Sequence, residues 1–327
     1  MGFNVRILSF VQVNKVSFQL DNDIPVHNLY PKKVSMKLHY LSAVRKIRNF
    51  VNVYEIDCLI CVDSILCAFT IPALIGKKIN HICWEHFNFN VDLGVFFRSF
   101  ARKLAAKYCT TIVTLTNRDK ELWQRGISNI HANIVPIPNP NPLKNINNRP
   151  HLSDKTILSI GRLTYQKGFD LLITAWAEVC KSNSAWKLKI IGNGEDETKL
   201  KQLAQDLEIS DRVIFFPSTS EIDKYYCNSS FYCLSSRFEG FPMVLLEAQA
   251  FGLPIIAFNC DTGPSDLVVH KENGFLVENG SINDLAEKLL EALNLSEIDY
   301  GKLSSNTLEM RNKFSSENVI LKWIEVL

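Results

Sequence analysis

The stretch TILSIGRLTYQKGFDLLITAWAEV, residues 156–179, carries the pattern that decides the fold. Its first five residues, Thr156–Ile160, form a short aliphatic run that predicts a buried strand. Residues 168–179 place apolar side chains at helical spacing, which predicts a helix beginning at Gly168. A strand, a glycine-bounded loop and a helix in this order form the repeating unit of a parallel α/β sheet.

The same alternation continues on the C-terminal side of this stretch. Short apolar runs predict further strands at 187–191, 213–216, 231–234, 254–258 and 274–277. Segments with helical spacing predict helices at 195–207, 242–251 and 282–293. Sheets of this type carry helices on both faces and bind ligands at the carboxyl ends of their strands. We therefore expect the ligand-binding residues in the loops that follow the strands.

The N-terminal side follows the same pattern less clearly. Apolar runs predict strands at 5–11, 57–62, 79–84 and 111–116, and helical spacing predicts helices at 37–50, 92–108 and 118–124. Between the two halves, residues 135–142 contain four prolines in eight positions, which predicts an interdomain linker. The predicted fold class is α/β, with two Rossmann-like, doubly wound domains.

Composition and charge agree with two globular domains. The chain has 327 residues, of which 46% are hydrophobic and 21% charged, which excludes a disordered or coiled-coil protein. The net charge of +2 hides an asymmetry, because residues 1–150 hold 19 Lys and Arg against 9 Asp and Glu. A basic half suggests contact with an anionic surface, and ordinary solvated helix faces are the alternative.

Cysteines and apolar stretches exclude several other classes. Cys58 and Cys61 resemble half of a metal motif, but no second pair follows, so the sequence predicts no metal site. We interpret the nine cysteines as buried thiols in a reducing cytoplasm. The apolar stretch 56–76 contains Asp57 and Asp63, which favours a strand and a core helix over a membrane span. The N-terminus is not typical of a secretory signal.

Two loops carry residues suited to binding phosphate and sugar. In the first, Gly161, Arg162 and Lys167 stand between a strand and a helix, where a backbone and two cations can meet an anion. In the second, Glu239 precedes a helix that contains Glu247, and carboxylates accept hydrogen bonds from sugar hydroxyls. The alternatives are a solvated turn and a helix start decorated with acids. Residues 192–194, Gly-Asn-Gly, do not complete a dinucleotide fingerprint, which disfavours a nicotinamide-dependent oxidoreductase.

Together these motifs resemble the retaining glycosyltransferases of the group 1 family, glycosyltransferase family 4. The resemblance rests on Gly161-Arg162 with Lys167-Gly168, followed by Glu239 and Glu247, and it covers nearly all of residues 150–327. It implies a GT-B fold with the active site in an interdomain cleft, no metal and no cofactor besides the nucleotide-sugar co-substrate. It also implies a diphosphate site formed by Gly161, Arg162 and Lys167.

The resemblance implies further roles for single residues. Glu239 and His86 would be catalytic: Glu239 would contact the donor sugar, and His86 would lie near the transferred sugar. The alternative for His86 is a satisfied loop histidine. Glu247 would bind the ribose. Backbone groups at the start of the following helix would complete the donor site, at Gly240, Phe241, Met243 and Val244.

The domain roles also follow from the resemblance. Residues 1–148 would form the acceptor-binding domain, 149–310 the donor domain, and 311–327 a helix crossing back to the first domain. Family members usually begin with a strand, a glycine-rich loop and a helix ahead of the strand at 5–11. We therefore expect an N-terminal domain that lacks its first β-α unit.

The expected reaction is transfer of a hexose or N-acetylhexosamine from a UDP-sugar, with GDP-mannose as second choice. The expected acceptor is a lipid-linked oligosaccharide of a bacterial surface polysaccharide such as O-antigen or capsule. Basic amphipathic helices would hold the protein on the anionic inner face of the cytoplasmic membrane. One of them is the helix at 92–108, which sets Phe96, Phe97, Phe100 and Leu104 among Arg98, Arg102, Lys103 and Lys107. No nucleic-acid-binding motif is present. The alternative is a non-catalytic glycosyltransferase-like subunit or a truncated inactive member.

Overall fold

The computed structural model describes residues 2–12, 20–21, 23–92, 96–143, 146, 149–183 and 185–327. The chain divides into two compact units. The first unit comprises residues 1–85, 92–113 and 127–135, and the second comprises residues 86–91, 114–126 and 136–327. Each unit is an α/β structure with parallel strands, which confirms the predicted fold class.

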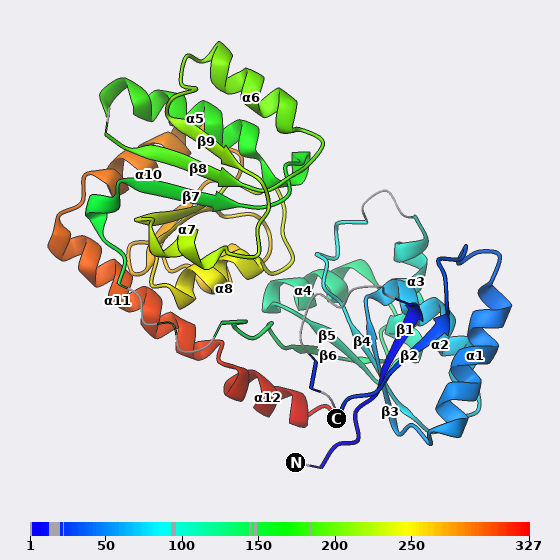
Figure 1. The fold of residues 1–327 in the computed structure, drawn as a ribbon. Coiled ribbons are helices and arrows are strands. Elements are labelled where there is room, and N and C mark those ends of the chain that lie inside the picture. Colours follow the sequence, from blue (N-terminus) through cyan, green and yellow to red (C-terminus); the bar gives the residue numbers. More distant parts are fainter. Residues whose placement is uncertain are drawn as a thin grey trace. The chain divides into compact units, whose positions relative to one another are not determined.

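The first unit is built around two small sheets. One pairs β1 (Ile7–Val11) with β2 (Val26–Tyr30) in parallel. The other has the order β3-β4-β5-β6, with strands Cys58–Val62, Asn80–Trp84, Thr111–Thr114 and Asn133–Pro136. Its helices are α1 (Tyr40–Val53), α2 (Cys67–Leu74) and α3 (Phe96–Tyr108), labelled in Figure 1. The stretch 56–76 is therefore a strand followed by a largely buried helix, as predicted.

Several expectations for this region need correction. The strand β2 was not predicted, because its polar residues interrupt the apolar run. The strand β6 ends at Pro136 inside the expected linker, which is possible because β6 lies at the edge of its sheet. The helix α1 begins at Tyr40 instead of Lys37. Leu38, ahead of the helix, and Leu41, within it, are 86% and 66% exposed. Residues 93–95 of the predicted helix 92–108 lie outside the described residues.

The second unit contains a six-stranded sheet in the order β12-β11-β10-β7-β8-β9. All of its neighbouring strands are parallel. Its strands are Thr156–Ile160 (β7), Lys187–Ile191 (β8), Val213–Phe216 (β9), Phe231–Leu234 (β10), Ile255–Phe258 (β11) and Gly274–Val277 (β12). Each predicted strand matches one of these, because each is a nearly continuous apolar run.

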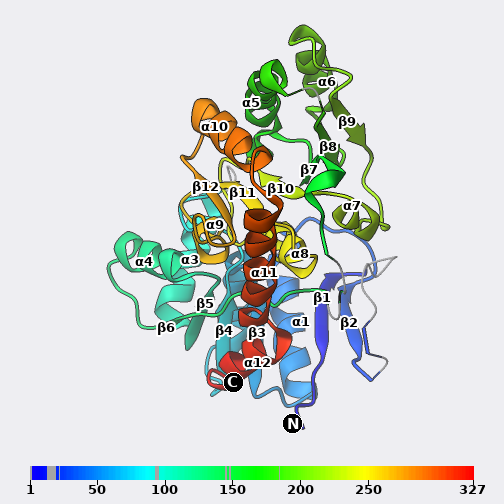
Figure 2. The same ribbon diagram turned by 90° about the vertical axis from the view of Figure 1, so that its left-hand side faces the viewer.

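The following helices belong to the second unit. They are α4 (Asn117–Gly126), α5 (Phe169–Ser182), α6 (Glu197–Asp206), α7 (Asp223–Cys227), α8 (Met243–Ala250), α9 (Pro264–Leu267), α10 (Ile282–Leu293), α11 (Glu297–Lys313) and α12 (Ser316–Ile324). The helix α11 was not predicted; Ser296 caps its start, and it packs along α8 (Figure 2). Within the part of the chain that the structure describes, every helix is too short or too polar to cross a bilayer.

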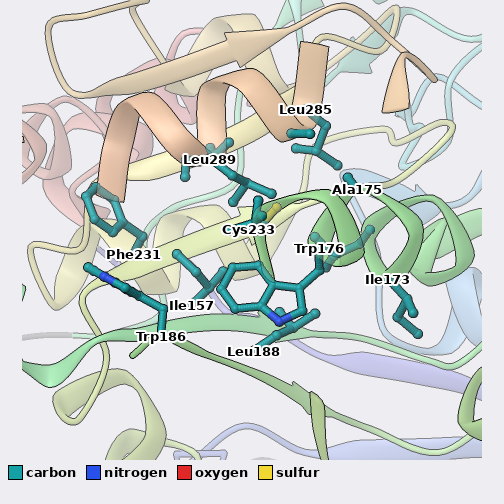
Figure 3. Close-up of a cluster of buried hydrophobic side chains, with 14 of the residues drawn as sticks. Ile157, Ile173, Ala175, Trp176, Trp186, Leu188, Phe231, Cys233, Leu285 and Leu289 are labelled. Carbon is teal, nitrogen blue, oxygen red and sulfur yellow. The ribbon is translucent and has the colours of Figure 1, made fainter. Parts of the chain in front are cut away.

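A tightly packed core fixes the sheet of the second unit. Trp176 of α5 is fully buried and lies among Ile157 of β7 and Leu188 of β8, with Leu289 of α10 nearby (Figure 3). Truncating a fully buried tryptophan typically costs about 3–5 kcal/mol. The strands that carry the loops described below are therefore held rigidly.

Candidate active site

The topology of the second unit singles out one point on its sheet. From β7 the chain proceeds to β8 and β9 on one side, and then returns to β10 on the other side of β7. Loops on either side of such a switch point diverge and leave room for a ligand at the carboxyl ends of the strands. The two loops at this point are residues 161–168 after β7 and residues 235–242 after β10. These are the two loops that the sequence analysis selected.

Gly168 brings the two loops into direct contact. Its φ of 62° is left-handed, and a Cβ at this position would overlap the carbonyl oxygen of Ser235. Ser235 Oγ donates to the carbonyl of Lys167 at 2.9 Å, and the amide of Arg237 donates to the carbonyl of Gln166 at 2.8 Å. The backbone therefore positions Lys167 toward the second loop.

Lys167 and Glu239 form a buried ion pair at this point. Lys167 Nζ lies 2.6 Å from Glu239 Oε1, and the two side chains are 17% and 8% exposed. Neither residue is near the other in sequence, so only the pairing of β7 with β10 brings them together. Without a ligand, each charge neutralises the other in a site with little water.

Gly161 and Arg162 begin the first loop. The amide of Gly161 donates to the carbonyl of Ile191, which continues the sheet by one residue. The aliphatic stem of Lys167 packs over Gly161, since a Cβ there would come within 3.3 Å of its carbons. The side chain of Arg162 is exposed. This loop thus presents one buried and one exposed cation.

The second loop leads into the N-terminus of α8. Pro242 is the N-cap residue, and the first amide that bonds back to it is that of Leu245, at 3.0 Å. The amides of Met243 and Val244 therefore belong to the set that a helix leaves without helical acceptors. Phe241 is buried and packs against Phe314 with ring centroids 5.7 Å apart.

Glu247 lies one turn further along α8. Its Oε2 accepts a hydrogen bond from the hydroxyl of Tyr226 at 2.7 Å. Burial raises the pKa of Glu247, against the opposing effect of this hydrogen bond. Tyr226, which the sequence analysis missed, is itself fully buried and stacks on Phe251 at 4.9 Å. It therefore fixes the orientation of the carboxylate.

The segment 86–91 belongs to the second unit and packs against the second loop. A Cβ on Gly240 would overlap the carbonyl oxygen of His86. Asn88 Nδ2 donates to Thr262 Oγ1 at 3.1 Å, and Thr262 Oγ1 donates to the carbonyl of Glu239 at 2.5 Å. His86 is thus held beside the Glu239 loop. Asn88 and Thr262 were missed, because an isolated amide or hydroxyl in a loop has no sequence pattern.

A buried ionic cluster in the first unit changes the interpretation of α3. Glu85 is fully buried; Arg102 Nε lies 3.0 Å from its Oε2, and Arg98 Nη1 lies 3.6 Å from its Oε1. Arg98 also pairs with Asp63 at 2.9 Å. The sequence analysis counted Arg98 and Arg102 among the bases facing a membrane, and that placement is wrong because both side chains are buried against carboxylates.

Comparisons with known proteins identify the family of the chain. The family model described as "Glycosyl transferases group 1" matches residues 144–315. An uncharacterized glycosyltransferase of Haemophilus influenzae is 41% identical over 326 residues, covering 100% of this chain and 91% of the relative. The lipopolysaccharide 1,6-galactosyltransferase of Salmonella typhimurium is 29% identical over 278 residues, covering 81% and 74%.

A solved structure shows the same fold. An Anabaena protein crystallised with UDP and glucose is 18% identical and superposes with a TM-score of 0.76, covering 93% of this chain and 85% of the other. The architecture is accordingly GT-B, with two Rossmann-like units. The chain belongs to the group 1 family of glycosyltransferases.

Proposed function

We propose that the chain transfers a hexose or N-acetylhexosamine from a UDP-sugar to a lipid-linked oligosaccharide in surface-polysaccharide synthesis, with retention and without a metal at the donor. The observation that carries this proposal is the meeting of Lys167 and Glu239 at the switch point of the second unit. A cation and a carboxylate placed there match a diphosphate and a sugar hydroxyl. The galactosyltransferase relative and the UDP- and glucose-bound neighbour support the substrate class.

The proposed chemistry assigns one task to each group. Lys167 and Arg162 neutralise the charge that develops as UDP leaves, and the amides of Met243 and Val244 add hydrogen bonds. Glu239 accepts hydrogen bonds from the donor sugar, and Glu247 accepts them from the ribose. The bond from the anomeric carbon to UDP breaks as the acceptor oxygen bonds on the same face. The departing phosphate takes the proton of the acceptor hydroxyl.

His86 contributes through its position beside Gly240. Its backbone carbonyl packs on Gly240, in the loop that carries Glu239. We assign it contact with the transferred sugar. His86→Ala is expected to reduce kcat more than it weakens UDP binding, since the nucleotide contacts lie on the two loops of the sheet.

Transfer by the purified chain tests the proposal. The protein is incubated with radiolabelled UDP-sugars and lipid extracts of the source bacterium, with no divalent cation added, and the anomeric configuration of the product is determined by NMR. We expect labelled glycolipid with a retained anomer, and at least a hundredfold loss in Lys167→Ala. Lys181→Ala is the matched control, because Lys181 is an exposed lysine of the same unit, paired with Glu178. Absence of both transfer and donor hydrolysis would favour the non-catalytic subunit.

The outward side of α3 supports the membrane part of the proposal. Phe97 and Phe100 are 40% and 49% exposed with ring centroids 5.9 Å apart, and Lys103 and Lys107 follow on the same side of the helix. Exposed aromatic rings beside lysines are suited to the headgroup region of an anionic bilayer. We call these four residues the aromatic-basic face, and we propose that it holds the protein on the inner face of the cytoplasmic membrane.

Vesicle flotation tests this face separately from catalysis. We expect the chain to float with vesicles rich in phosphatidylglycerol, and to remain unbound with phosphatidylcholine alone or in high salt. Phe97→Ser/Phe100→Ser should abolish flotation. The control is Ile298→Ser, which removes an exposed apolar side chain, 73% exposed, from the second unit. Equal flotation of both variants contradicts the proposal.

A further inference from the structure

A group of metal-ligating side chains lies in the core of the first unit. It consists of Cys61 on β3, Cys67 at the start of α2 and His81 on β4. In the parallel register, Leu59 pairs with His81 and Cys61 with Cys83. Alternate residues of a strand share a face, so Cys61 and His81 project to the same side of the sheet, toward α2.

This grouping differs from the pair visible in the sequence. Cys58 and Cys61 are three positions apart on one strand, and residues at that spacing point to opposite faces. Cys58 and Cys61 therefore cannot bind the same metal ion. The partners of Cys61 come instead from a neighbouring strand and a helix, which no local spacing reveals.

The distances fit a small tetrahedral ion. Cys61 Sγ lies 3.3 Å from His81 Nε2, and Thr70 Oγ1 lies 3.1 Å from Cys61 Sγ and 3.0 Å from His81 Nε2. The ligand atoms of Cys61, Cys67 and His81 all lie within 4.8 Å of one another. Zinc bonds of about 2.3 Å to sulfur and about 2.0 Å to nitrogen place these two ligands roughly 3.6 Å apart. Small side-chain shifts would therefore bring Cys61 Sγ and His81 Nε2 to the separation of two zinc ligands.

The surroundings favour a dry, ordered site. The side chains of Cys61, Cys67, Thr70 and His81 are at most 6% exposed. The other ring nitrogen of His81, Nδ1, lies 3.6 Å from Cys109 Sγ. A partner at Nδ1 orients the imidazole so that Nε2 faces the ligands, as partners of zinc-binding histidines commonly do.

We propose that Cys61, Cys67 and His81 bind one zinc ion, with the Thr70 hydroxyl on the fourth side. Two thiolates balance the charge of Zn²⁺, so the complete site is neutral and suits an apolar core. Binding releases the two thiol protons to solvent. The ion joins β3, β4 and α2, and it stabilises the first unit.

Metal content and a cobalt spectrum test the proposal on the full chain. Protein produced with zinc is passed over a chelating resin, and bound zinc is measured by mass spectrometry. We expect about one zinc ion per chain, and a chain loaded with Co²⁺ that absorbs as a tetrahedral cobalt–thiolate complex. Only trace zinc, or a cobalt spectrum without thiolate absorption, overturns the proposal.

Variants identify the ligands. Cys61→Ser and Cys67→Ser are each expected to lose at least nine tenths of the bound zinc and the rise in thermal midpoint that zinc produces. Cys233→Ser is the matched control, because Cys233 is a fully buried thiol in the second unit. Zinc retained by both ligand variants refutes the assignment, as does a Cys67–Cys109 disulfide found by peptide mapping. If a ligand variant fails to fold, the cobalt spectrum of the parent chain decides.

Discussion

Replacing Lys167 with methionine should strongly destabilise the second unit. The substitution keeps most of the side-chain volume but leaves the carboxylate of Glu239 without its partner, 2.6 Å away, in a position where the side chain is only 8% exposed. Breaking a buried ion pair from one side typically costs about 3–5 kcal/mol. We expect a loss in that range for Lys167→Met, because the Glu239 carboxylate is largely buried.

The reverse change should cost less. Glu239→Gln leaves an ammonium group on a long, flexible stem, and the Lys167 side chain is 17% exposed, so it can extend toward solvent. The double variant Lys167→Met/Glu239→Gln removes both charges and should regain about 2 kcal/mol relative to the sum of the single losses.

Urea unfolding followed by tryptophan fluorescence measures these energies. Four of the five tryptophans lie in the second unit, including Trp176 and Trp186 in its core, so the signal follows that unit. The reasoning is refuted if the two single losses add in the double variant to within about 0.5 kcal/mol. Lys181→Met, at an exposed pair, serves as the control and should change stability by less than about 0.5 kcal/mol.

Three further predictions concern other parts of the molecule. Burial raises the pKa of Glu247, so its ionisation opposes folding as the pH rises through that pKa. Glu247→Gln should therefore be more stable than the parent at neutral pH, with the difference shrinking in acid; thermal unfolding across pH checks the sign. Arg102→Met should destabilise the first unit by about 1–3 kcal/mol, because it removes the nearer of the two arginines paired with the fully buried Glu85, and hydrogen exchange would locate the loss. Phe97→Ser/Phe100→Ser should leave the thermal midpoint within a few degrees of the parent, since both rings are exposed, and a larger drop would mean that they are structural.

The strands of the second unit could be predicted from the sequence because their burial follows a simple pattern. Most residues of its strands are buried, so most of these strands are nearly continuous apolar runs bounded by turn residues. The loops that follow β7 and β10 could be selected for the same reason, since glycines and charged residues stand out at the ends of such runs. The pairing of Lys167 with Glu239 could not be read locally, because it depends on β10 returning to the side of β7.

Helix faces in the first unit were harder to predict. Helical spacing on α3 suggested phenylalanines inside and arginines outside, but the structure buries Arg98 and Arg102 and exposes Phe97. The reason is Glu85: a fully buried carboxylate at the end of β4 needs cations, and they come from α3. Sequence periodicity carries no information about a charge on another element. For the same reason, the sequence did not reveal the partners of Cys61, which lie on a neighbouring strand and a helix.

Equilibrium binding of UDP to the ligand-free chain tests the central claim most directly. The claim is that the loops at the switch point of the second unit form the site for a nucleotide diphosphate, with Lys167 as its buried cation. Calorimetry should give one UDP per chain, with affinity weakened about 10- to 100-fold in Lys167→Met, the loss of one charge-assisted hydrogen bond, and unchanged in Lys181→Met. Equal affinity in the parent and Lys167→Met, with both folded, would contradict the account.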